Sequence, residues 1–196
     1  MKAIVLAGGE NSRYPSPKAF LKAGDETIIE RTLRVLREAV SEDVLISTNE
    51  PEMYFQFGVP LIGDTVKGAG PMGGIVSVFE ATGADELFVA ACDMPFIRAE
   101  VVQYIIANRE GPATAAVMNG RVNPLLAVYS LNLLGEMKNR LAKGRLSLVG
   151  LLEDTGAALL EEKALRELDP EGESFANVNT PEDYEQLMAQ ARKARP

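Results

Sequence analysis

Mostly apolar segments and amphipathic segments alternate along this chain. The apolar segments predict strands at residues 3–7, 43–49 and 86–93, the last of them buried on both faces of a sheet. Ile29, Leu33, Leu36 and Val40 recur at helical spacing and predict a helix over residues 27–40. This alternation of strands and helices predicts a three-layer α/β fold with a mostly parallel sheet.

Shorter signals predict the other elements. Pro60 places a short strand at 59–64 on a sheet edge, because proline cannot donate to a strand ladder. Thr180 and Pro181 predict a helix start, with threonine as the N-cap and proline at the first helical position. The other expected elements are a glycine-rich loop at 68–74 with a helix from residue 75, a helix at 99–108, strands at 113–118 and 124–129, and a helix at 132–142. The remaining segment, 144–173, allows a short helix at 148–152 and either a strand or a helix start at 157–161.

The first predicted strand leads into a loop that suits a nucleoside triphosphate. Gly8 and Gly9 let main-chain N–H groups approach phosphate oxygens closely, and the cations of Arg13 and Lys18 offset phosphate charge. The loop has neither the Walker A spacing nor the Gly-x-Gly-x-x-Gly pattern of dinucleotide-binding proteins. An ordinary strand-to-helix turn is the alternative explanation of the glycine pair.

Polar residues end several predicted strands. Ligands of open α/β sheets bind beyond the carboxyl ends of the strands, where Asn49, Asp64 and Asp93 are expected. Asp93 ends an apolar strand, and a buried carboxylate there needs a cation or hydrogen bonds, which a Mg²⁺ ion shared with substrate phosphates would supply. The alternatives are that Asp93 caps a short helix through Pro95, and that Asn49 and Asp64 are turn residues.

Composition excludes several kinds of chemistry. The 196 residues include no histidine, so an imidazole base, a Ser-His-Asp triad and a His-bound metal are excluded. Cys92 is the single cysteine and cannot form an internal disulfide. The net charge of −8 argues against nucleic-acid or anionic-membrane partners. With no leader or membrane-spanning pattern, we expect one cytoplasmic domain spanning residues 1–196.

Five motifs in this order resemble the molybdenum cofactor guanylyltransferase family, over residues 3 to about 185. They are LAGG at 6–9 with Ser12, Arg13 and Lys18, GPMGGI at 70–75, CDMPF at 92–96, NPLLAVY at 123–129 and NVNTPED at 177–183. The first motif alone indicates only the wider nucleotidyltransferase superfamily. The resemblance implies a Rossmann-like nucleotidyltransferase that transfers GMP from GTP to molybdopterin and releases pyrophosphate.

The resemblance also implies roles for individual residues. Leu6, Ala7 and Gly8 would contact the guanine nucleotide, and Gly9, Arg13 and Lys18 would surround its phosphates. Asn49 and Asp64 match strand-end nucleotide-binding positions, and Asp93 matches the Mg²⁺ ligand, so that Lys18, Arg13 and Asp93 form the catalytic set. The motif residues Asn177 and Asn179 match the pterin side or the surroundings of the metal. Other cofactor-assembly proteins are implied as partners.

The first loop departs from the family pattern. Family members usually carry Arg-Met-Gly before an Asp-Lys pair, whereas this chain has RYPSPK at 13–18, without that glycine and that aspartate. Pro15 and Pro17 stiffen the loop, and each removes an N–H donor. Alternatives to guanylyl transfer are cytidylyl transfer, transfer to a sugar phosphate, and a non-catalytic GTP-binding protein.

Overall fold

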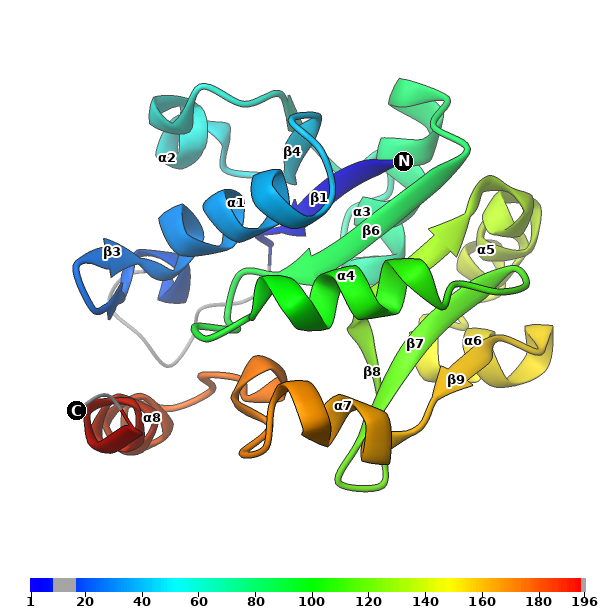
Figure 1. Cartoon of the computed structure of the whole chain (residues 1–196). Helices are drawn as coiled ribbons and strands as arrows, with labels where there is room; N and C mark the ends of the chain where they lie inside the picture. The colour runs from blue at the N-terminus through cyan, green and yellow to red at the C-terminus, as the bar shows by residue number, and fades with distance from the viewer. Residues whose placement is uncertain (9–16, 195–196) are drawn as a thin grey trace.

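A seven-stranded sheet forms the centre of the structure, a computed structural model that describes residues 1–8 and 17–194 (Figure 1). In sheet order, the strands are β5 (Leu61–Ile62), β4 (Val44–Ser47), β1 (Lys2–Leu6), β6 (Glu86–Ala91), β8 (Arg121–Ser130), β7 (Ala113–Met118) and β9 (Ala158–Leu160). β8 runs antiparallel to both of its neighbours, and the other pairs are parallel. The predicted mostly parallel sheet is confirmed, with β5 at an edge as Pro60 indicated.

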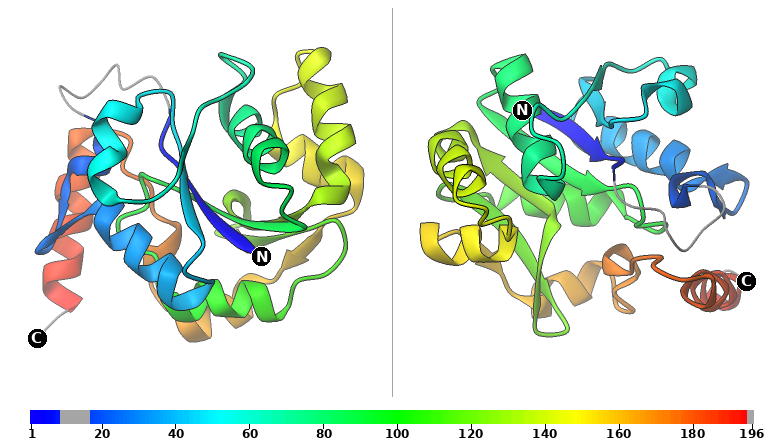
Figure 2. Two further views of the ribbon diagram at one scale, coloured as in Figure 1. Left: turned by 90° about the horizontal axis from the view of Figure 1, so that it is seen from above. Right: turned by 180° about the vertical axis from the view of Figure 1, so that it is seen from behind.

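Helices cover both faces of the sheet, as the views in Figure 2 show. On one face lie α1 (Ile28–Ala39), α4 (Ala99–Ala107) and α7 (Glu162–Leu168), and on the other α3 (Gly70–Thr82), α5 (Leu134–Ala142) and α6 (Leu148–Thr155). One apolar cluster, which includes Leu33 and Val101, fills the first interface, and another, which includes Phe79 and Leu151, fills the second. The three-layer architecture is confirmed.

Local hydrogen bonds explain where two helices begin. At the start of α1, the Glu30 main-chain N–H donates to Thr27 Oγ1, and the Thr27 N–H donates to the Glu30 carboxylate at 2.7 Å, which forms a capping box. At the start of α8 (Pro181–Ala194), the Asp183 N–H donates to Thr180 Oγ1 at 3.1 Å, which confirms the predicted cap. Both helix starts are therefore encoded locally.

Several short elements had no clear signal in the sequence. They are α2 (Pro51–Tyr54), the hairpin of β2 (Lys22–Ala23) and β3 (Glu26–Thr27), α7, and the 3-10 helices η1 (Lys18–Phe20), η2 (Phe55–Phe57), η3 (Leu131–Leu133) and η4 (Glu173–Phe175). In the ambiguous segment, the short helix is α6 and residues 158–160 form a strand rather than a helix start. Within the described residues, no helix is both long and apolar enough to cross a membrane.

The glycine-rich segment at 68–74 is helical for most of its length, which corrects the prediction of a loop. α3 begins at Gly70, five residues earlier than expected, with Pro71 in its first turn. Proline suits that position because its fixed φ is helical and its missing N–H would have no intrahelical partner. The glycines inside the helix serve close packing, as the site described below shows.

The strand order reverses beside β1. From β1 the chain moves outward to β4 and β5 and then returns to form β6 on the other side of β1. Connections leaving the carboxyl ends of β1 and β6 therefore diverge, which opens a crevice at this edge of the sheet.

Candidate functional site

A cavity of about 720 Å³ opens at the carboxyl edge of the sheet. It is lined by Leu6, Ala7, Gly8, Ser47, Thr48, Asn49, Glu50, Asp64, Gly68, Gly70, Pro71, Gly74, Ala91, Cys92, Asp93 and Leu125. The residues of this set that the sequence predicted are Leu6, Ala7, Gly8, Asn49, Asp64 and Asp93. Four separate segments of the chain therefore bring predicted site residues to one cavity.

Asp93 follows β6 and carries an unsatisfied carboxylate oxygen. Its Oδ1 atom is buried and has no hydrogen-bond partner among the described residues. Burial raises the pKa of this carboxyl, while the charge of Lys18 and the main-chain N–H of Asp93 itself act in the opposite direction. The alternative that Asp93 caps the next helix is wrong, because α4 begins at Ala99 with Arg98 at the cap position.

Lys18 connects the first and last motifs electrostatically. Its charge opposes the rise that burial causes in the pKa of Asp93, and it adds to the main-chain N–H groups of Thr180 and Asn179 in lowering the pKa of Asp183. Lys18 itself begins η1, directly after the first loop. The predicted residues Gly9 and Arg13 and the stiffening Pro15 lie outside the described residues.

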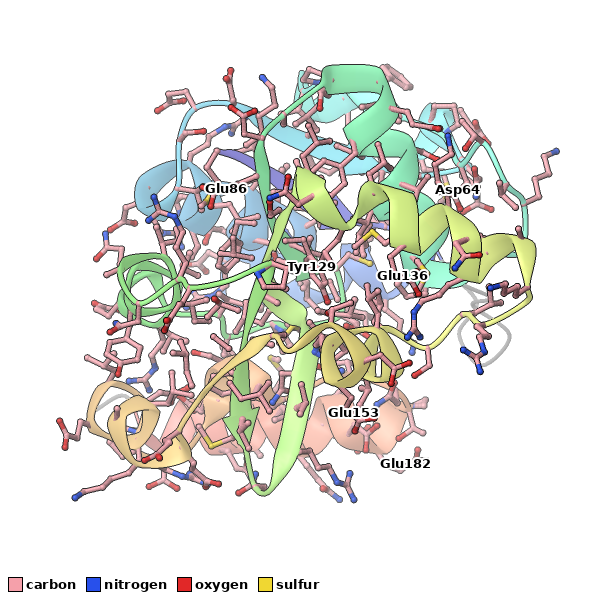
Figure 3. All side chains as sticks on the ribbon, turned by 90° about the vertical axis from the view of Figure 1, so that its right-hand side faces the viewer. Asp64, Glu86, Tyr129, Glu136, Glu153 and Glu182 are labelled. Atoms are coloured by element: carbon pink, nitrogen blue, oxygen red, sulfur yellow. The ribbon has the colours of Figure 1, made fainter. Side chains whose placement is uncertain are left out.

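Asn49 and Asp64 form a reciprocal pair on the cavity wall. The Asn49 side-chain amide donates to Asp64 Oδ2 at 2.9 Å, and the Asp64 main-chain N–H donates to Asn49 Oδ1 at 2.9 Å. Asp64, labelled in Figure 3, lies beside α3. The pair joins the segments that follow β4 and β5 and leaves Asp64 Oδ1 outside the pair as an acceptor facing Gly74.

Gly74 lets α3 pack against the ends of β1 and β4. A Cβ atom at this position would lie 2.6 Å from Ser47 Oγ and 2.9 Å from Leu6 Cδ2, both on residues that line the cavity. At Gly73 a Cβ would lie 2.7 Å from the Ala69 Cβ. Glycine is therefore required at 73 and 74 because neighbouring atoms approach the α3 backbone closely. The sequence pattern alone does not distinguish such packing glycines from those of a flexible loop.

Leu125 lines the cavity from β8, next to an irregularity in that strand. The register of β8 against β7 shifts between Ala115, which pairs with Ala127, and Ala116, which pairs with Asn123. The hydroxyl of the fully buried Tyr129, labelled in Figure 3, donates to the Pro124 carbonyl at 2.8 Å across this irregularity. The NPLLAVY motif was visible in the sequence, but its contribution to the cavity wall depends on the pairing of β8 with β6, which places Leu126 opposite Ala90.

Asn177 and Asn179 do not line the cavity, yet their segment is attached to the Asp93 loop. Both residues are exposed and flank Val178, which is fully buried. The Val178 main-chain N–H donates to the Asp93 carbonyl at 2.9 Å. The NVNTPED motif therefore lies next to the loop that carries Asp93.

Comparison with known proteins identifies the family. A family model described as the MobA-like NTP transferase domain matches residues 3–158, which is most of the chain. The chain belongs to this family. Since the family consists of nucleotide-transferring proteins and the named relatives are guanylyltransferases, the chain is a nucleotidyltransferase enzyme.

Relatives of this MobA-like chain match it over nearly its full length. It is 32% identical to a probable molybdenum cofactor guanylyltransferase of Pelotomaculum thermopropionicum, over 98% of this chain and 94% of the relative. It is 31% identical to the molybdenum cofactor guanylyltransferase of Desulfosudis oleivorans, over 98% and 96%. The solved structure of molybdopterin-guanine dinucleotide biosynthesis protein A from Archaeoglobus fulgidus superposes with a TM-score of 0.80 at 25% identity, covering 98% of this chain and all of that one.

The donor atoms at the MobA-like site suit a hard divalent cation held mainly by its substrate. Within residues 1–8 and 17–194, no three carboxylate, thiol or imidazole side chains gather closely enough to hold a metal ion. Among the described residues the buried Oδ1 of Asp93 has no hydrogen-bond partner, and Mg²⁺ commonly takes one or two carboxylates and completes its shell with phosphates and water. Asp93 therefore fits a carboxylate ligand of such an ion.

Cys92 also lines the cavity but is not a nucleophile. Burial raises the pKa of its thiol to about 12, the nearby Asp93 charge acts in the same direction, and Lys18 opposes both. The thiol is therefore neutral at pH 7, and only the thiolate is reactive. The surroundings of Cys92 therefore do not activate it as a nucleophile.

The Asp183 cap predicts a pH-dependent contribution to stability. The N–H groups of Thr180 and Asn179 donate to the Asp183 carboxylate and lower its pKa from 3.8. A lowered folded-state pKa gives stability above the unfolded value that is lost as the pH falls through the folded value. We expect Asp183→Asn to lower the melting temperature at neutral pH but not in strong acid, as measured by thermal melts across this range. An equal loss at every pH would contradict the charge-based explanation.

Proposed function

We propose that this nucleotidyltransferase transfers GMP from GTP to molybdopterin, with molybdopterin guanine dinucleotide and pyrophosphate as products. The observation that carries the proposal is the meeting, in one cavity, of the main chain at residues 6–8 and a buried carboxylate oxygen of Asp93 that has no partner in the described part of the chain. The relatives named as guanylyltransferases at about 30% identity support guanine as the base. We take residues 1–196 as one catalytic domain acting in the cytoplasm, together with other cofactor-assembly proteins.

The reaction is an in-line displacement at the α-phosphorus of the nucleotide. A phosphate oxygen of the acceptor forms the new bond to phosphorus, and the bond from phosphorus to the oxygen bridging the β-phosphate breaks, with its electron pair leaving on pyrophosphate. A phosphate monoester is already largely ionised at pH 7, so no side chain has to remove a proton. The absence of histidine from this chain is therefore compatible with the proposed reaction.

In this reaction the residues of the chain would bind and orient the nucleotide and neutralise the charge on its phosphates. The main-chain N–H groups of the first loop, with Gly9 and Arg13, would contact the triphosphate, and Lys18 would offset charge that develops on it. The Asn49–Asp64 pair would hold the base side of the nucleotide, because the Asp64 carboxylate offers acceptors to the donor groups of guanine. Asp93 would hold Mg²⁺, which when bound neutralises charge on the phosphate oxygens.

Nucleotide preference tests the base assignment. With Mg²⁺ present, GTP is expected to raise the melting temperature more than CTP or UTP, because a ligand that binds only the folded state stabilises it according to its affinity. The measurement is a thermal-shift series at equal nucleotide concentrations. A larger shift with CTP would favour cytidylyl transfer.

Turnover tests the reaction itself. Purified molybdopterin with GTP and Mg²⁺ is expected to release pyrophosphate, whereas GTP without an acceptor is not. Sugar phosphates in place of molybdopterin serve as the control for acceptor choice. Binding of GTP without pyrophosphate release from any acceptor would instead favour a non-catalytic GTP-binding protein.

A further inference from the structure

A fully buried carboxylate outside the cavity, that of Asp169, binds the segment that leads to Asn177 and Asn179. Asp169 has no exposed surface and accepts hydrogen bonds from the main-chain N–H groups of Glu173, at 3.1 Å, and Ser174, at 2.7 Å. The Nε atom of Arg98 lies 3.4 Å from Asp169 Oδ1. Buried carboxylates are stable only with such compensation, so this site is a specific connection between distant parts of the chain.

Arg98 and Ser174 extend the connection to the loop after Asp93. The Arg98 guanidinium donates to Glu173 Oε2 at 2.7 Å and to the Leu168 carbonyl at 3.3 Å. The Arg98 main-chain N–H donates to Ser174 Oγ at 3.2 Å. The Ser174 hydroxyl in turn donates to the Phe96 carbonyl at 3.5 Å. Residues 168–174 are therefore hydrogen-bonded to residues 96–98, which follow Asp93 by a few positions.

A second attachment lies just beyond this network. The Val178 N–H donates to the Asp93 carbonyl at 2.9 Å, and the Val178 side chain packs in a small apolar cluster with Phe96 and Ile28. The exposed Asn177 and Asn179 flank Val178. The direction in which the side-chain amides of Asn177 and Asn179 point therefore depends on two attachments of the segment to the Asp93 loop, one through the Asp169 network and one through Val178.

We propose that Asp169 is a positioning residue that holds Asn177 and Asn179 beside Asp93, where they meet the acceptor. The inference rests on the proposed function, in which these asparagines lie on the acceptor side. Asp169 is not among the residues that line the cavity. It acts through Arg98 and Ser174 on the segment that ends at the bond between Val178 and Asp93.

Two variants separate positioning from folding. Asp169→Asn keeps the shape of the side chain but removes its charge, and its amide group turns a donor toward N–H groups that need an acceptor. Ser174→Ala is milder, because it removes only the hydroxyl that joins Arg98 and Phe96. Glu136→Gln is the matched control: Glu136, labelled in Figure 3, pairs with the buried Arg140 on the opposite face of the sheet.

The first measurement is amide hydrogen exchange by NMR and does not depend on activity. In both variants the Val178 amide is expected to exchange at least about tenfold faster than in the parent, because the segment opens locally more often. Amides of α5 and α6 are expected to be unchanged in these variants. In Glu136→Gln the Val178 amide should exchange as in the parent. Parent-like exchange at Val178 in both variants overturns the proposal, and if Asp169→Asn fails to fold, Ser174→Ala decides the question.

The second measurement is steady-state pyrophosphate release with GTP and molybdopterin. The KM for molybdopterin is expected to rise about tenfold in Asp169→Asn while the KM for GTP stays within about twofold. A lower kcat with both KM values unchanged would indicate only a smaller folded fraction and overturns the positioning role, as does an equal rise of both KM values. If the parent itself releases no pyrophosphate, the proposed function fails, whereas the exchange at Val178 still shows whether Asp169 holds the segment on Asp93.

Discussion

Asp93→Ala is expected to lower nucleotidyl transfer by about 10³-fold or more, equivalent to about 4 kcal/mol of transition-state stabilisation. The reason is that Oδ1 of Asp93 is the buried oxygen without a partner in the described part of the cavity and is the atom that fits Mg²⁺. Steady-state pyrophosphate release at saturating Mg²⁺ measures the effect. Activity that survives there would make the metal assignment wrong.

The fold is expected to survive this substitution. Because burial raises the pKa of Asp93, the folded state holds its proton more tightly than the unfolded chain does, and ionisation of Asp93 opposes folding as the pH rises. Removing the carboxylate at neutral pH should therefore leave the melting temperature largely unchanged. Glu86→Gln is the control, since Glu86, labelled in Figure 3, lies at the other end of β6 and pairs with Arg109. Its activity should match that of the parent.

Gly74→Ala is expected to weaken GTP binding about tenfold, equivalent to about 1.4 kcal/mol. The added Cβ would lie 2.6 Å from Ser47 Oγ and 2.9 Å from Leu6 Cδ2, so these side chains must shift within the cavity wall. Crowding costs about 1–3 kcal/mol, which the higher helix propensity of alanine offsets by about 0.5–1 kcal/mol. Calorimetric titration with GTP and thermal melts measure the two effects separately.

Gly135→Ala is the matched control for Gly74→Ala. Gly135 also lies inside a helix, α5, but a Cβ there would meet no atom within 4 Å. This variant should bind GTP as the parent does and gain about 0.4–1 kcal/mol of stability. Equal GTP affinity in the two variants would contradict the view that Gly74 sets the width of the nucleotide cavity.

Periodicity and capping signals predicted most of the regular structure. The order of the longer strands and helices through α5 follows from alternating apolar patterns, because side chains that face the core recur with the period of their own element. The capping box at Thr27 and the cap at Thr180 were predictable for the same reason, since each involves residues a few positions apart. The short β2–β3 hairpin and α2 contain too few residues to show a period.

The site was predictable as a set of residue types but not as a geometry. Placing Asn49, Asp64 and Asp93 at strand ends required only the rule that parallel strands end at one edge of the sheet. The cavity brings these three together, as expected. Asn177 and Asn179 were expected at the site as well, but they lie beside the cavity, and the hydrogen bond from the Val178 N–H to the Asp93 carbonyl holds their segment there.

The amino-acid sequence was sufficient to predict most of the longer strands and helices, the charged residues at the strand ends, and the absence of histidine chemistry. Three features depend on packing between distant segments: Gly74 is a packing glycine inside α3, the pairing of β8 with β6 brings Leu125 to the cavity, and Asp169 joins Arg98 to the segment that carries Asn177 and Asn179. The physical reason is that burial patterns are local to each element. Contacts between distant segments depend on strand order, register and close approach, which appear only when the layers pack.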